Sequence, residues 1–151
     1  MDDNLMATLK KMALEIAGLR QDVEDLKRRE IPAGLWKAWT PASQTGWTAM
    51  PTGTFRYVNI GKLVILEINV TAGTSNSTWA AIALPFTAAS SGGWTGTMGF
   101  AMNNGAAIPT ATRWNIGAGD GTIYFFTDMY AGGWVASGTK LVNCVAIYER
   151  A

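Results

Sequence analysis

Apolar residues recur at alternating intervals of four and three along the first thirty residues of the chain. This spacing is the heptad pattern of a coiled coil, in which the a and d positions form a seam between parallel helices. The a positions are Leu9, Ile16 and Val23, and the d positions are Leu5, Met12, Leu19 and Leu26. The pattern predicts a short N-terminal parallel coiled coil over residues 1–31, which Pro32 and Gly34 would end.

Charged residues of the same segment support this register independently. Glu15 is a g residue and Arg20 is the following e residue, and Asp22 and Lys27 stand in the same relation. Both pairs attract between parallel helices, so we expect interchain ion pairs at these four positions.

The seam is compatible with two orders of association. Ile and Val at a with Leu at d favour two strands, whereas the small residues Thr8 at g and Ala13 at e leave room for three. Three heptads form a marginal helix on their own. We therefore expect the domain that follows to oligomerise as well, and we predict a homotrimer.

After residue 35 the helical period stops, and short runs rich in β-branched and aromatic residues follow, separated by turn residues. Tight turns at Ile60-Gly61 and Asp120-Gly121 predict hairpins. The fold class is therefore mainly β, with an antiparallel β-sandwich or jelly-roll head over residues 36–151 after a linker over 32–35. The predicted strands are Trp36–Thr40, Thr54–Ile60, Lys62–Thr71, Trp79–Leu84, Gly96–Met102, Thr110–Ile116, Thr122–Asp128 and Lys140–Glu149, with a weaker ninth at Thr45–Met50.

Two of these runs are apolar on both faces, namely Leu63–Leu66 and Leu141–Tyr148. Within the strand Lys62–Thr71, the alternation places Val64, Leu66, Ile68 and Val70 on one face. A single sandwich would expose the apolar side chains of the other face. Contact with neighbouring subunits would cover them, so this face is the expected second oligomerisation surface.

Charge is concentrated in the coiled-coil segment. Residues 1–31 hold 13 of the 23 charged residues, and the whole chain carries a net charge of +1. This balance argues against binding nucleic acid, and no apolar run is long enough to insert into a membrane. Cys144, the single cysteine, lies in an apolar run, where we expect a small buried hydrophobe rather than a reactive thiol.

Five short motifs occur in a fixed order between residues 36 and 88. They are Trp39-Thr40-Pro41, Gly53-Thr54-Phe55-Arg56-Tyr57, Ile60-Gly61-Lys62-Leu63-Val64, Thr71-Ala72-Gly73-Thr74 and Ile82-Ala83-Leu84-Pro85-Phe86-Thr87. In this order and spacing, they resemble the head domains of phage tail-fibre and receptor-binding (minor tail) proteins. The chain departs from that pattern at Pro41-Ala42-Ser43 and at Pro51-Thr52, both in predicted turns.

The resemblance implies a trimeric, fibre-like component of a virion, made in the host cytoplasm. Its stalk would attach to other virion proteins, and its distal end would contact a glycan or protein of the host surface. A capsid decoration protein or head fibre of the same architecture is the alternative. No residue separates tail from capsid.

Catalytic chemistry finds little support in the residues. The chain has no histidine, which excludes Ser-His-Asp and Cys-His catalysis and the common zinc sites. Asp120 with Asp128 is the acid pair considered for a glycan depolymerase, but both are expected in turns or at strand ends. The run Gly117–Gly121 precedes a strand, which indicates a hairpin turn and not a phosphate-binding loop. We predict no enzyme, no cofactor and no metal.

Tryptophans are the most suggestive feature, because there are seven. Trp94 and Trp134 lie in glycine-rich runs, where an exposed indole could stack on a sugar ring, and Tyr130 is close to the second of them. The competing interpretation is that these rings pack between subunits or fix their loops. Of the other tryptophans, Trp79 is expected in the core, and Trp36 and Trp39 are expected to lock the coiled coil onto the head.

Overall fold

The computed structural model describes residues 8, 11–12, 14–20 and 35–151, and the chain divides into two compact units, Met1–Leu35 and Trp36–Ala151. Residues 14–20 are helical and carry Ile16 and Leu19 of the predicted seam as well as Glu15 and Arg20. Met12, Ile16 and Leu19 are each at least half exposed in the single chain. The remaining seam and ion-pair residues lie outside the described residues, so the coiled coil stays a prediction: Leu5, Leu9, Asp22, Val23, Leu26 and Lys27.

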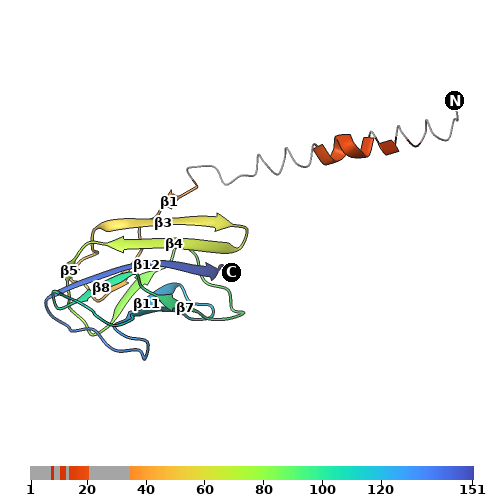
Figure 1. Ribbon diagram of the computed structural model, residues 1–151. Helices are drawn as coiled ribbons and strands as arrows, with labels where there is room; N and C mark the ends of the chain where they lie inside the picture. The colour runs from red at the N-terminus through yellow and green to blue at the C-terminus, as the bar shows by residue number, and fades with distance from the viewer. Residues whose placement is uncertain (1–7, 9–10, 13, 21–34) are drawn as a thin grey trace. The chain divides into compact units, whose positions relative to one another are not determined.

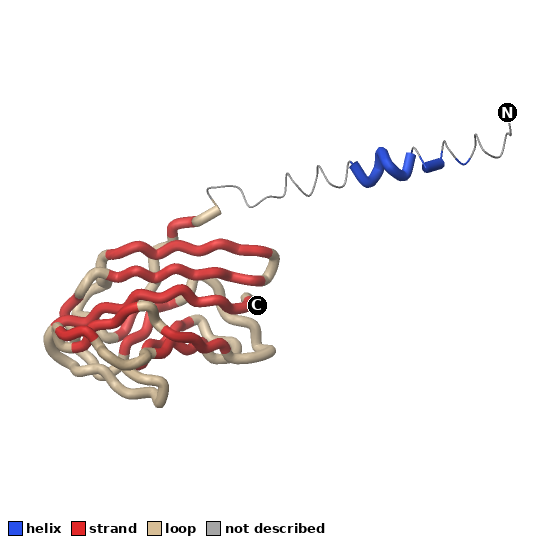
Figure 2. Tube along the Cα trace, viewed as in Figure 1, coloured by secondary structure: helices blue, strands red, loops and turns tan. Residues whose placement is uncertain are grey.

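The unit Trp36–Ala151 is built from two antiparallel sheets, as Figures 1 and 2 show, which confirms the mainly β class. One sheet has seven strands in the order β1-β3-β4-β12-β8-β9, with β5 also paired to β12, and the other has five in the order β2-β6-β11-β10-β7. The strands are β1 (Lys37–Ala38), β2 (Gln44–Thr45), β3 (Gly53–Ile60), β4 (Leu63–Val70), β5 (Gly73–Thr74), β6 (Ala80–Ala83), β7 (Trp94–Thr97), β8 (Phe100–Asn103), β9 (Ala106–Ala107), β10 (Arg113–Ile116), β11 (Thr122–Phe126) and β12 (Thr139–Glu149).

The core lies between the two sheets and draws on the inward-facing residues of both. Strand β4 contributes its even-numbered residues from Val64 to Val70, all fully buried, which confirms the predicted alternation. Strands β10 and β11 contribute Ile116, Ile123 and Phe125 from the opposite sheet. Cys144 on β12 joins the same core, and burial raises the pKa of its thiol to about 12, as expected for a small buried hydrophobe.

Both predicted hairpins are present. Strands β3 and β4 pair antiparallel with Ile60 opposite Leu63, and Gly61 at the turn has φ +61°, a conformation that glycine adopts without steric cost. Strands β10 and β11 also pair antiparallel, and the Asp120 N–H donates to the Gly117 carbonyl across their turn at 3.1 Å. The run Gly117–Gly121 is therefore a turn between strands, as predicted.

The predicted strand Gly96–Met102 is wrong, because the chain changes sheets in its middle. The Met98 N–H donates to Thr112 O at 3.1 Å, beside the five-stranded sheet, and the next N–H, of Gly99, donates to Asn143 O on β12 at 2.9 Å. One half is therefore β7 and the other half is β8. Of the weaker ninth strand, Thr45–Met50, only Thr45 lies in a strand, as the second residue of β2, and Trp47 forms an isolated bridge with Ser75.

The placement of Trp79 in the core is also wrong. Ala80 and Ile82 of β6 face the core, and side chains alternate along a strand, so Trp79 faces outward and is 57% exposed. Trp36 and Trp39 both pack on β3: the Trp39 ring meets Phe55 edge to face at 5.5 Å, and the Arg56 guanidinium lies 4.7 Å from the Trp36 ring centroid.

Candidate functional site

The outer face of the seven-stranded sheet is unusually apolar. The register places the odd-numbered residues of β4 and β12 and the even-numbered residues of β3 and β8 on this face. Five large apolar side chains there are between 41% and 54% exposed, namely Ile60, Leu63, Phe100, Val145 and Ile147. They span four neighbouring strands, with Glu67, Asn69 and Asn143 between them, and we call this surface of the sheet the outer face.

An ion pair lies on the outer face among these residues. Arg56 Nε donates to Glu67 Oε2 at 2.7 Å, and Arg56 Nη2 lies 2.7 Å from the same oxygen. The two residues face each other across β3 and β4, and Glu67 in turn stands opposite Val145. Because the two charges neutralise each other within one chain, another subunit could cover this face without supplying a charged partner.

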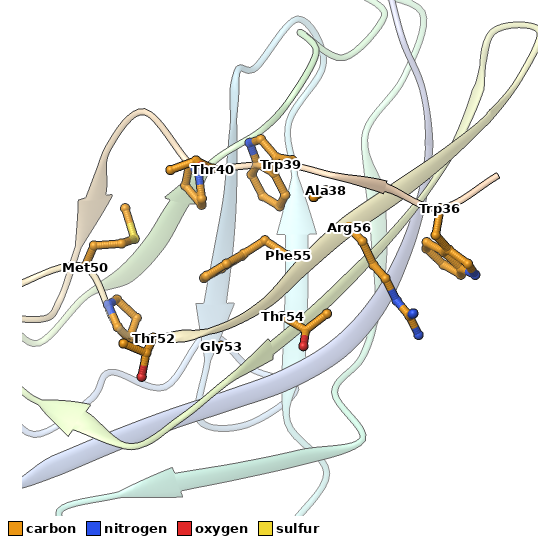
Figure 3. A pocket seen from close by; sticks show the side chains of 12 residues that line it. Trp36, Ala38, Trp39, Thr40, Met50, Thr52, Gly53, Thr54, Phe55 and Arg56 are labelled. Atoms are coloured by element: carbon orange, nitrogen blue, oxygen red, sulfur yellow. The ribbon is translucent and has the colours of Figure 1, made fainter. Parts of the chain in front are cut away.

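A hollow of about 660 Å³ is open to solvent and lies beside β1 and β3 (Figure 3). Trp36, Trp39, Phe55 and Arg56 line it together with threonine side chains. Trp36 is the first residue of this compact unit, so the hollow lies where the chain enters the head.

A buried lysine joins three distant segments of the head. The side chain of Lys140 is fully buried, and its Nζ donates to the carbonyls of Gly46 at 3.1 Å, Ser77 at 3.0 Å and Trp79 at 2.9 Å. The same ammonium lies 5.5 Å from the Trp47 ring centroid and 5.2 Å from that of Trp134. Burial lowers the pKa of Lys140 to about 8, while the three carbonyls and two ring faces favour the cation.

The loop after β11 is held by its own hydrogen bonds. Asp128 Oδ1 accepts from the N–H groups of Tyr130 at 2.7 Å and Gly132 at 2.8 Å. Thr127 N–H donates to Gly132 O at 3.0 Å, and Ala131 adopts φ +68°, which is uncommon for a residue with a Cβ. The loop therefore has a defined shape, and at its tip Tyr130 is 94% exposed.

A small hollow of about 130 Å³ lies between this loop and β6. Trp79 and Phe126 form its aromatic walls, with ring centroids 6.5 Å apart at 72°, and residues 131–133 form the loop side. Arg113 on the neighbouring strand β10 places its guanidinium 4.8 Å from the Phe126 ring centroid. We call this site the aromatic hollow.

The structure does not bring together the three aromatic residues predicted for glycan contact. Tyr130 is exposed beside the aromatic hollow, but Trp134 is only 3% exposed and donates from Nε1 to Phe125 O at 2.8 Å, so it has no free ring face. Trp94 is half-buried against Tyr148. It pairs with Ile116, at the end of β10 opposite to the end near Tyr130.

Sequence reasoning missed Trp79, Phe126 and Arg113 as members of one surface. The available signal was the alternation within Thr122–Phe126, where Tyr124 and Phe126 share the face opposite to the buried Ile123 and Phe125. Which strands lie beside β11 could not be read from that pattern.

Asp120 and Asp128 do not have the arrangement of a glycosidase pair. They lie beyond opposite ends of β11, whose five residues alone span about 14 Å. Paired glycosidase carboxylates stand no more than about 9.5 Å apart. The Gly117 N–H donates to Asp120 Oδ2 at 3.2 Å, so both acids fix turns.

No protein-family model, curated protein or solved structure matches this chain. Within the described part of the chain, no three acidic, cysteine or histidine side chains gather where they could hold a metal ion. None of the described helical segments is long and apolar enough to cross a membrane.

Proposed function

We propose that this protein is a structural component of a phage virion, a homotrimeric tail fibre or receptor-binding protein whose head contacts the host surface. The outer face is the observation that carries this proposal. Its five exposed apolar side chains would be unfavourable on an isolated sandwich, whose outward positions are normally polar. Subunit contact would remove them from water, which stabilises the assembly by about 25 cal/mol per Å² of apolar surface buried.

The N-terminal heptads support the same assembly independently. A parallel coiled coil over residues 1–31 would bring the heads of three chains together at one end, so the outer faces could meet. The coiled coil and a jelly-roll description of the head are parts of this proposal. The resemblance of the motifs between residues 36 and 88 to phage tail-fibre heads supports placing the assembly in a virion.

The proposed partners follow from this assignment. The N-terminal segment attaches to other virion proteins, and the head meets a glycan or protein of the host. The protein acts as a scaffold and binder, without catalysis, cofactor, metal, nucleic acid or membrane insertion. It is made in the host cytoplasm and ends in the virion.

Sedimentation of the full chain tests the assembly. We expect a trimer for the unaltered chain and a lower mass when Val145→Glu and Ile147→Glu place two carboxylates on the outer face. Thr97→Glu is the matched control, because Thr97 is exposed and faces outward from the other sheet. A monomeric unaltered chain, or a trimer indifferent to the paired charges, would contradict the proposal.

The virion position needs a separate experiment, because a capsid decoration protein or head fibre could share this architecture. Immunogold labelling of intact virions with antibody against the head distinguishes the two positions. Gold at the tail supports the receptor-binding assignment. Gold over the capsid would replace it with the decoration role.

A further inference from the structure

The aromatic hollow has an exposed aromatic ring in its wall, a second exposed ring on the loop beside it, and a rigid frame. Trp79 is 57% exposed on one side of the hollow, and Tyr130 is 94% exposed on the adjoining loop tip. Exposed aromatic rings of this size leave large apolar faces in water. Neither ring fills the core, so each presents an apolar face that a ligand could contact.

The frame of the hollow is fixed from two directions. Asp128 holds the loop through the N–H groups of Tyr130 and Gly132, and the Trp134 N–H donates to Thr78 O at 2.9 Å, which ties the loop to the segment before β6. The carbonyl of Trp79 accepts from the buried Lys140 ammonium at 2.9 Å. Because these hydrogen bonds already order the loop, a ligand that contacts the rings does not have to order it on binding. This lowers the entropic cost of binding.

The size of the hollow selects the class of ligand. Sites for drug-sized molecules usually occupy about 300–1,000 Å³, whereas this hollow measures about 130 Å³. A second copy of the chain would have to cover about 800 Å² of surface, far more than one ring-sized recess offers. The occupant should therefore be a single small ring presented by a larger, mostly solvent-exposed molecule.

The chemistry of the walls suits a sugar ring. A pyranose has an apolar C–H face and a rim of hydroxyl groups, so it matches aromatic faces flanked by hydrogen-bond donors. The Trp79 side chain in the wall and the Tyr130 side chain on the adjoining loop each carry such a donor, and the Arg113 guanidinium lies against Phe126.

We infer that the aromatic hollow binds one pyranose unit of a bacterial surface polysaccharide, with Trp79 and Tyr130 as the stacking residues. This inference deepens the proposed contact with the host and depends on it for its biological setting. It replaces the expectation of glycan contact through Trp94 and Trp134. Trp94 is half-buried at the far end of β10, and Trp134 lies in the core.

Binding of the purified full chain to an array of bacterial lipopolysaccharide O-chains, capsular polysaccharides and teichoic acids tests the site. We expect the unaltered chain to bind at least one polysaccharide. Trp79→Ala and Tyr130→Ala should each weaken that binding at least tenfold. Trp94→Ala is the matched control and should change it less than twofold, because that indole lies away from the hollow.

Tyr130→Ala is the decisive variant, since a side chain so exposed can be removed without disturbing the core. Unchanged binding by Tyr130→Ala and Trp79→Ala, or no binding to any polysaccharide on the array, overturns the inference. If the chain is trimeric and labels the tail but binds no polysaccharide, the site fails while the proposed function stands. If a monomeric chain binds polysaccharide through these residues, the site stands while the proposed trimeric assembly fails.

Discussion

Replacing Lys140 with methionine tests how a buried cation stabilises the head. Methionine has a similar length and is apolar, so Lys140→Met keeps most of the packing but leaves the carbonyls of Gly46, Ser77 and Trp79 without the ammonium. The Gly46 carbonyl also accepts from the Asn76 N–H at 3.2 Å and the Ser77 carbonyl from the Ser75 hydroxyl at 3.5 Å, so the largest penalty falls on the Trp79 carbonyl. These carbonyls belong to the segments that precede and support β6.

The expected cost is a difference between two opposing contributions. Hydrogen bonds to a charged group contribute about 1.5–3 kcal/mol each, and Lys140 makes three. Burial lowers the pKa of Lys140 from 10.5 to about 8, so the desolvation of the ammonium, which methionine relieves, offsets part of this contribution. We therefore expect Lys140→Met to lower the free energy of unfolding at pH 7 by about 3 kcal/mol.

The pH dependence gives a second signature. Between pH 8 and pH 10.5, the unfolded chain keeps the Lys140 proton and the folded protein releases it, so this group makes the free energy of unfolding rise with pH. Cys144 and Tyr148, whose pKa values burial raises to about 12, act in the opposite direction at high pH but are common to both proteins. The difference in stability between the unaltered chain and Lys140→Met should therefore grow as the pH rises across this window.

Urea unfolding followed by tryptophan fluorescence, at one fixed protein concentration and at several pH values from 7 to 10.5, measures both effects. Lys62→Met is the control, because Lys62 is exposed in the turn between β3 and β4, and it should change stability by less than about 0.5 kcal/mol. Equal stability of Lys140→Met and the unaltered chain at pH 7 would refute the hydrogen-bonding argument. A pH-independent difference would refute the lowered pKa.

Three further predictions follow from particular contacts. The Cys144 thiol should resist iodoacetamide in the folded protein and react once the protein is unfolded in urea, because burial keeps it protonated; rapid labelling of the native protein would contradict its place in the core. Gly96→Ala should lower the free energy of unfolding by about 1–3 kcal/mol, since a Cβ there would lie 2.6 Å from the Trp114 ring. Gly92→Ala is the control, because a Cβ at Gly92 meets open space and should leave the stability unchanged, and thermal melting compares the two variants. Asp128→Ala should accelerate amide hydrogen exchange in residues 128–134 at least tenfold while leaving β4 protected, and equal protection would show that its two hydrogen bonds do not hold the loop.

Much of the fold could be predicted from the sequence, because the relevant signals are local. Alternation along Leu63–Val70 identified the buried face of β4, since side-chain direction along a strand has a period of two. Gly61 identified the β3–β4 turn, because the positive φ that such a turn needs depends on the residues of the turn itself and not on distant contacts. The burial of Cys144 followed from the apolar run around it.

Other features were decided by contacts between distant segments. The break at Met98–Gly99 depends on which strand each N–H meets, and those partners, Thr112 and Asn143, lie in different sheets. Lys140 reads as a surface residue by its type, yet it is buried because carbonyls more than sixty residues away along the chain converge on its ammonium. Trp79 was expected in the core and is exposed for the same reason: a local pattern gives alternation, but only the pairing of the sheets determines which face is covered.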